Sequence, residues 1–165
     1  MLKWTAIVVV GLIALAAVVA LVGTFLPKSH RASKTMVLAA TPATIYAAIT
    51  DVANYSRWRS DLKGVEVLPD DGQGPRFRED GNNGKITFRF ETLEPNRRVV
   101  TRIADPSLAF GGTWTYDLTP SGSGTELTIT EDGEVYNPIF RTISKFMSQT
   151  ATIERYLADL QKHSL

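Results

Sequence analysis

The sequence of 165 residues contains no cysteine and only two histidines. The absence of cysteine excludes a disulfide framework and thiol chemistry, and it fits either side of a bacterial membrane. His30 lies in a short polar segment and His163 is two residues from the C-terminus, so neither is expected inside a domain. Cys–His and Ser–His–Asp sites are therefore not expected, and a zinc site would need carboxylates alone. We assign no catalytic residue, no metal ligand and no cofactor from the sequence.

Charged residues are missing from the run between Trp4 and Leu26. A helix over this run would be about 34 Å long, enough to cross a hydrocarbon core of about 30 Å. A lone span in lipid has to be helical, because its backbone must satisfy its own hydrogen bonds. A cleaved signal peptide is the alternative, but its apolar region is shorter, about 7 to 15 residues. We predict that residues 1–27 form a single-pass anchor in the cell membrane, with residues 4–26 in the bilayer.

Acidic residues are absent from the first 50 positions, whereas Lys28, Arg31 and Lys34 follow the apolar run. The positive-inside tendency therefore favours a cytoplasmic location for the rest of the chain. We interpret residues 28–34 as a polar, basic tether. Residues 35–165 carry a net charge of about −3, since they hold 14 basic and all 17 acidic residues. This balance gives no indication of a nucleic-acid-binding surface.

After the tether, the sequence predicts a strand and two short helices. Residues 35–40 are a strand candidate. Thr41 and Pro42 then form a typical helix start, with a capping hydroxyl group followed by proline at the first helical position. A helix over residues 43–50 and a short helical turn over residues 53–59 follow.

Six strand candidates come next, separated by turns rich in glycine, proline and asparagine. Apolar and polar residues alternate in them, most clearly in residues 86–90 (ITFRF). In residues 138–163 the apolar positions change to helical spacing and predict one long amphipathic helix, capped by Asn137. The strand candidates are residues 65–67, 76–79, 86–90, 99–103, 114–118 and 127–129.

These elements predict an α+β fold with one domain over residues 35–165. A curved antiparallel sheet of about seven strands exposes one apolar face, and the long C-terminal helix can cover it. The N-terminal transmembrane helix is added to this domain.

Residues 40–46 (ATPATIY) and 50–58 (TDVANYSRW) resemble the opening of the START-like superfamily, also called SRPBCC, and of its polyketide cyclase/dehydrase-like group. Further similarities are LEPNRR at residues 93–98, GTWTY at 112–116 and GTELTI at 124–129. The resemblance covers about residues 33–163 and implies the helix-grip fold, a sheet wrapped around a long C-terminal helix. Two features depart from the family: Arg59 stands near a position that is often proline, and most members lack the hydrophobic anchor.

The resemblance implies a hydrophobic pocket between the sheet and the C-terminal helix. Alternation places Phe88, Phe90, Trp114 and Tyr116 on its sheet wall. The helix would contribute Ile139, Phe140, Ile143 and Met147, and the remaining expected ligand-binding residues are Trp58, Phe77 and Tyr136. The alternative is that these side chains only fill a solid core.

The densest acidic group of the sequence, Glu131, Asp132 and Glu134 beside Tyr136, has two interpretations. It could protonate or orient a carbonyl group of a polyketide-like ligand at the mouth of the pocket. Alternatively, it is a solvated strand end without a chemical role.

Three functions follow as hypotheses. The first is a membrane-tethered protein that binds or transfers a lipid, a quinone or a polyketide-like molecule without catalysis. The second is a cyclase/dehydrase- or hydrolase-type enzyme that uses carboxylate and tyrosine acid–base chemistry. The third is a protein-interaction module with a collapsed cavity. The lack of cysteine and of an interior histidine disfavours the enzyme, and the anchor favours an apolar ligand found in membranes.

Overall fold

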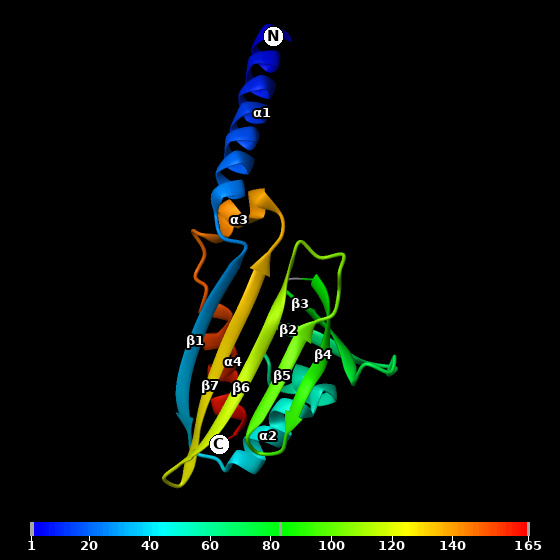
Figure 1. Ribbon diagram of the computed structural model, residues 1–165, viewed down its shortest axis with the longest axis vertical. Coiled ribbons are helices and arrows are strands. Elements are labelled where there is room, and N and C mark those ends of the chain that lie inside the picture. Colours follow the sequence, from blue (N-terminus) through cyan, green and yellow to red (C-terminus); the bar gives the residue numbers. More distant parts are fainter. Residues whose placement is uncertain (1, 83, 165) are drawn as a thin grey trace.

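The computed structural model describes residues 2–82 and 84–164 (Figure 1). An N-terminal helix extends away from a domain that consists of one sheet with helices at its two ends and behind it. In chain order the elements are α1 (Leu2–Phe25), β1 (Ser29–Leu38), α2 (Pro42–Thr50), the 3₁₀ helix η1 (Val52–Arg57), β2 (Leu62–Leu68), β3 (Arg76–Gly81), β4 (Gly84–Glu94), β5 (Arg98–Ile103), β6 (Phe110–Ser121), β7 (Gly124–Val135), α3 (Pro138–Ser144) and α4 (Ala151–His163).

The strands form one antiparallel sheet in the order β1-β7-β6-β5-β4-β3-β2. β2 to β7 are therefore neighbours in the order of the chain, whereas β1 pairs with the last strand, β7. This seven-stranded antiparallel sheet with a C-terminal helix packed on it confirms the predicted α+β fold.

The helix α2 begins as the sequence predicts. The hydroxyl oxygen of Thr41 accepts a hydrogen bond from the backbone N–H of Thr44, and Pro42 occupies the first helical position. Ile45 and Ile49, four residues apart, share one face of the helix and are fully buried. α2 and η1 carry the chain from β1, at one edge of the sheet, to β2, at the other.

The segment predicted as a tether, residues 28–34, is not a tether. From Ser29 onward it is β1, whose first six residues pair with Glu134 to Ile129 of β7. The sequence hid this strand because Ala32 is the one apolar residue in the segment, and its side chain is buried. Pairing with β7 stabilises the strand where the hydrophobic pattern does not predict it.

The single helix predicted over residues 138–163 is two helices in the structure. α3 ends at Ser144 and α4 begins at Ala151. The polar residues 148–150 interrupt the apolar stripe between the two helices. α4 lies behind the sheet, whereas α3 packs beside the end of α1 (Figure 1).

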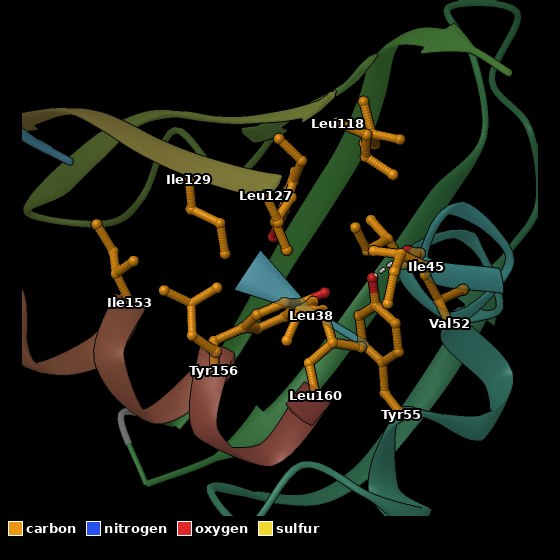
Figure 2. Packing of buried hydrophobic residues seen from close by; sticks show 14 of the residues in the cluster. Leu38, Ile45, Val52, Tyr55, Leu118, Leu127, Ile129, Ile153, Tyr156 and Leu160 are labelled. Carbon is orange, nitrogen blue, oxygen red and sulfur yellow. Dashed lines mark hydrogen bonds between the residues drawn. The ribbon is translucent and has the colours of Figure 1, made fainter. Parts of the chain in front are cut away.

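The hydrophobic core lies between α4 and the face of the sheet that α4 covers, which we call the inner face. Figure 2 shows Ile153, Tyr156 and Leu160 of α4 facing the strands. Tyr55 of η1 closes this core from the side of α2, and its hydroxyl group donates a hydrogen bond to the backbone carbonyl oxygen of Ile49. The strand side chains in this part of the core are Leu38, Leu118, Leu127 and Ile129.

Candidate functional site

The helix α4 covers only part of the inner face. In Figure 1 it lies behind the half of the sheet that is nearer to α2. Nearer to α3, inner-face side chains remain partly exposed because residues 145–150 are not helical. Four apolar residues form this surface, which we call the candidate ligand-binding face: Phe88, Ile103, Phe110 and Trp114.

The strand register brings these side chains onto one side of the sheet. Phe88 of β4 lies opposite Ile103 of β5. Trp114 of β6 lies opposite Thr101 of β5 and opposite Glu131 of β7. Residues directly opposite each other project from the same face, so an apolar surface with one acidic side chain runs across the middle strands.

The sheet residues predicted to bind a ligand lie in two environments. Phe77, Phe90 and Tyr116 are buried and belong to the packed core. Phe88 and Trp114 are partly exposed at the edge of that core. The Phe88 ring stacks on Phe77 with centroids 5.5 Å apart, and the centroids of Trp114 and Tyr116 are 6.1 Å apart. The predicted sheet wall thus consists of side chains packed in the core and, next to them, side chains that are accessible from outside.

Trp58, also predicted to bind a ligand, joins η1 to the end of α4. Its ring stacks on His163 with centroids 5.5 Å apart and an interplanar angle of 12°. It also meets Tyr156 edge-on at 5.3 Å. The contacts of Trp58 are therefore those of a packing residue at the C-terminal end of the helix.

The remaining predicted residues gather at the end of the domain next to α1. The exposed Tyr136 donates a hydrogen bond to Glu134 at 2.9 Å. The residues expected on the helix wall lie on α3 or just after it. They do not line the sheet, because α3 packs mainly against α1. These residues are Ile139, Phe140, Ile143 and Met147, and all are exposed. Phe140 meets the candidate ligand-binding face at Phe110, with ring centroids 6.3 Å apart.

Two polar residues that are distant in the sequence, His30 and Glu131, form a pair on the inner face. His30 Nε2 lies 3.6 Å from Glu131 Oε1, and each side chain is 24% exposed. The imidazole ring lies over Gly133, where an added Cβ atom would come within 2.2 Å of the ring. The missing side chain of Gly133 therefore makes room for His30. Only the recognition of β1 as a strand could have predicted this pair, since His30 lies opposite Gly133 in the register.

The His30–Glu131 pair adds polar chemistry to the apolar face. Burial raises the pKa of Glu131, and the neighbouring His30 acts in the opposite direction. A carboxyl group and an imidazole can hydrogen-bond a polar group of a ligand and exchange a proton with it. The predicted acidic cluster is split by strand alternation: Glu131 faces inward, whereas Asp132 and Glu134 project from the other side.

A second charged group is buried between η1, β3 and α4. The guanidinium group of Arg59 lies 2.8 Å from Asp61 and 2.5 Å from Glu79. Its Cζ atom also lies over the rings of Tyr55 and Tyr156, at 5.4 and 5.1 Å. Burial alone would lower the pKa of Arg59, but the two neighbouring carboxylates have the larger effect and raise it. Both carboxylates are paired with the guanidinium group, so we interpret this cluster as structural.

One small pocket opens beside this cluster. It measures about 50 Å³, lies between the β3–β4 hairpin and the start of α4, and is lined by Asp61, Glu79, Ile86 and Arg155 among others. Ligand pockets usually measure about 300–1,000 Å³, so this one is too small for a lipid. In residues 2–82 and 84–164, no group of three histidine, aspartate or glutamate side chains is arranged to hold a metal ion.

Comparison with solved structures places this architecture among known folds. A START superfamily protein from Mycobacterium smegmatis is 22% identical, with a TM-score of 0.65, over 82% of this chain and 97% of that chain. The ZhuI aromatase/cyclase from Streptomyces sp. R1128 is 14% identical, with a TM-score of 0.71, over 82% and 93% of the two chains. Norcoclaurine synthase from Thalictrum flavum is 12% identical, with a TM-score of 0.67, over 82% and 94%. At such identities the likeness shows the fold.

The sequence comparisons agree with the fold. No curated protein sequence matches the chain at a significant level. The family model described as polyketide cyclase/dehydrase and lipid transport matches residues 29–164. This range includes all of β1. The START-like resemblance is confirmed, and the chain belongs to the polyketide cyclase/dehydrase and lipid transport family.

Proposed function

We propose that this chain is a membrane-anchored protein that binds or transfers an apolar small molecule, such as a lipid, a quinone or a polyketide-like compound. One observation carries the proposal: α4 leaves part of the inner face uncovered, so Phe88 and Trp114 stay partly exposed. Apolar side chains on a concave surface, with a few polar groups beside them, are typical of ligand sites. The ligand would lie against this face with a polar group directed to His30 and Glu131.

The helix α1 supports the membrane anchor. Its segment Lys3–Phe25 is long and apolar enough to cross a membrane, and only a small part of it is buried against the domain. The junction with the domain supports an uncleaved helix, because the buried guanidinium of Arg141 donates hydrogen bonds to the carbonyl oxygens of Gly23 and Leu26. Cleavage between these residues would remove one acceptor. Lys28 and the other basic residues after α1 favour a cytoplasmic domain.

The anchor is tested on the full chain produced in bacteria. We expect it to remain in the membrane pellet after carbonate extraction and to keep the mass of the uncleaved sequence. A protein released by carbonate, or a mature form that begins near Thr24, contradicts the anchor.

Ligand binding is tested by native mass spectrometry of the detergent-purified full chain and by titration with a fluorescent fatty acid. We expect a co-purified apolar molecule and saturable binding of the probe. Trp114→Ala, at the candidate ligand-binding face, should weaken probe binding. The matched control is Leu93→Ala, which truncates an exposed apolar residue elsewhere on the sheet. Equal binding by both variants, or no binding by the unmodified chain, contradicts the proposal.

A second function, catalysis, is favoured by the position of the His30–Glu131 pair beside the apolar face. The solved structures of similar fold include an aromatase/cyclase and norcoclaurine synthase. The two functions differ in what the protein retains. A binding protein retains the same molecule in the unmodified chain and in the His30→Asn variant. An enzyme with an acid–base role for His30 accumulates a different molecule, its unreacted substrate, in the variant.

A further inference from the structure

Exposed apolar side chains gather where α1 joins the domain. Phe25, at the end of α1, is 84% exposed, and Phe146, just after α3, is 89% exposed. The other members of this group, which we call the junction patch, are Ile139, Phe140, Ile143 and Met147. Exposed apolar side chains gathered in one region of a protein surface mark a contact with a partner or a membrane.

The position of α3 relative to α1 is set by specific contacts. The hydroxyl group of Thr142 donates a hydrogen bond to the carbonyl oxygen of Val19 at 2.9 Å. The guanidinium of Arg141 donates to the carbonyl oxygen of Gly23 at 2.8 Å. The helices approach so closely that a Cβ atom at Gly23 would lie 1.9 Å from the carbonyl oxygen of Pro138. α3 is therefore packed against the last turns of α1.

These contacts place α3 at a definite depth once α1 spans a bilayer. Val19 precedes the end of the span at Phe25 by six residues, which corresponds to about 9 Å along a helix axis. Helices that lie in a membrane interface bury their apolar face about 5–10 Å into the boundary between headgroups and acyl chains. Thr142, which bonds to Val19, would therefore lie at the depth to which interfacial helices bury their apolar face.

The charges around the junction patch fit a membrane surface. Residues 135–153 contain no acidic side chain, and two exposed lysines lie close to patch residues in the sequence: Lys28 follows Phe25 by three residues, and Lys145 directly precedes Phe146. Basic residues near a bilayer are attracted to anionic headgroups, and carboxylates there would be repelled. Apolar side chains beside lysines are the composition of helices that lie on membranes.

We propose that α3 and the following residues Lys145 to Met147 are a second membrane contact, inserted in the interface of the same leaflet in which α1 ends. The proposal rests on the proposed function only in taking α1 as the membrane span. It goes further, because it fixes how the domain faces the bilayer. Phe140 of the junction patch touches Phe110 of the candidate ligand-binding face. The uncovered part of the inner face therefore opens towards the lipid, and an apolar ligand can enter it from the bilayer.

The absence of cysteine from the sequence allows a direct test with single nitroxide labels. The full chain carries Ile143→Cys, Phe146→Cys or Met147→Cys, each at an exposed position, and is reconstituted in bilayers of phosphatidylcholine and phosphatidylglycerol. Ser123→Cys, in the exposed hairpin between β6 and β7 at the far end of the sheet, is the aqueous control. We expect oxygen accessibility to exceed that of a water-soluble nickel complex at the three test positions, and the reverse at Ser123.

A fourth label, Ile13→Cys in the middle of α1, separates this proposal from the proposed function. If Ile13 lies in lipid while Ile143, Phe146 and Met147 report water, the second membrane contact is overturned and the anchor stands. If Ile13 also reports water, the anchor and the second contact both fail. Lipid-like accessibility at Ile13 and at the three test positions supports the proposal.

The functional consequence is tested with the same bilayers. The double variant Phe146→Ser/Met147→Ser should load a fluorescent fatty acid from labelled vesicles more slowly than the unmodified chain. The matched control, Val37→Ser/Leu93→Ser, removes two exposed apolar residues of the sheet that lie outside the candidate ligand-binding face and the junction patch. It should load at the unmodified rate, and equal loading by all three proteins overturns the entry of ligand from the bilayer.

Discussion

The guanidinium group of Arg141 in α3 donates a hydrogen bond to the backbone carbonyl oxygen of Gly23 in α1, at 2.8 Å. The same side chain donates to the carbonyl oxygens of Leu26, Val135 and Tyr136, and it is buried. The last carbonyl groups of a helix have no partner within the helix, so Arg141 acts as a cap of α1 supplied by the distant end of the chain. The helix α1 and the domain are consequently joined by a defined contact rather than by a flexible linker.

The first prediction concerns the removal of this cap. Arg141→Met loses hydrogen bonds from a charged donor, each worth about 1.5–3 kcal/mol. We expect the free energy of unfolding of the full chain in detergent to fall by at least about 1.5–3 kcal/mol, the contribution of one such bond. Lys145→Met, an exposed substitution just after the same helix, serves as the control and should leave it unchanged. Equal stability of the two variants would show that Arg141 does not hold α3 to α1.

The second prediction uses the two glycines of α1. A Cβ atom at Gly23 meets the backbone of Pro138, whereas one at Gly11 meets nothing within 4 Å. Gly23→Ala should therefore push α3 away from α1 and destabilise the junction by about 1–3 kcal/mol, as overpacking does. Gly11→Ala should be neutral or slightly stabilising, because alanine is the better helix former. Protease cleavage within residues 145–150 reports the loosened junction, and no difference between the variants would contradict it.

The third prediction concerns the buried charge cluster. Arg59→Met leaves the carboxylates of Glu79 and Asp61 in the core without their cation, which destabilises a protein by about 3–5 kcal/mol. Arg57→Met, two residues earlier and exposed, is the control and should be nearly neutral. The double variant Arg59→Met/Glu79→Gln should recover part of the loss, since it removes one uncompensated charge. Chemical denaturation measures all three, and full stability of Arg59→Met would refute the structural role of the cluster.

The fourth prediction is a pH dependence. Burial raises the pKa of Glu131 in the folded protein, so its contribution to stability is present below the pKa of the unfolded chain and is lost as the pH rises through the folded value. Glu131→Gln removes this loss. We expect the stability of the variant relative to the unmodified chain to increase between about pH 4, near the ordinary glutamate pKa, and neutral pH.

The control for this pH dependence is Glu126→Gln, an exposed position of the same strand, β7. It should show no such trend. Repeating the comparison in a His30→Asn background removes the interaction of Glu131 with the neighbouring imidazole. A pH-independent difference between Glu131→Gln and the unmodified chain would contradict the burial of a charged Glu131.

The fifth prediction separates packing from binding on the inner face. Phe77 is buried in the core, so Phe77→Ala should cost about 3–5 kcal/mol of stability. Phe88 stacks on Phe77 but is partly exposed, so Phe88→Ala should cost less and should weaken fatty-acid binding more. Thermal unfolding and probe titration give the two readouts. A larger stability loss for Phe88→Ala, with unchanged binding, would assign Phe88 to the core and not to a ligand site.

The local chemistry of the chain determined a large part of the fold. The capping pair Thr41-Pro42 predicts the start of α2, and the uncharged run predicts α1, because these signals act over a few residues. Alternation predicts the strands and the inward-facing parity of Phe88 and Trp114. The family resemblance then predicts how one helix packs against the sheet.

The tertiary structure decided the features for which local signals were weak or misleading. The polar start of β1 becomes a strand only through its pairing with β7, and this pairing alone brings His30 to Glu131. The helical pattern of residues 138–163 is divided into α3 and α4, and Arg141 and Thr142 of α3 bind carbonyl groups of α1, more than one hundred residues earlier in the chain. Contacts between distant segments have no period in the sequence, so the junction of α1 and the domain became visible only in three dimensions.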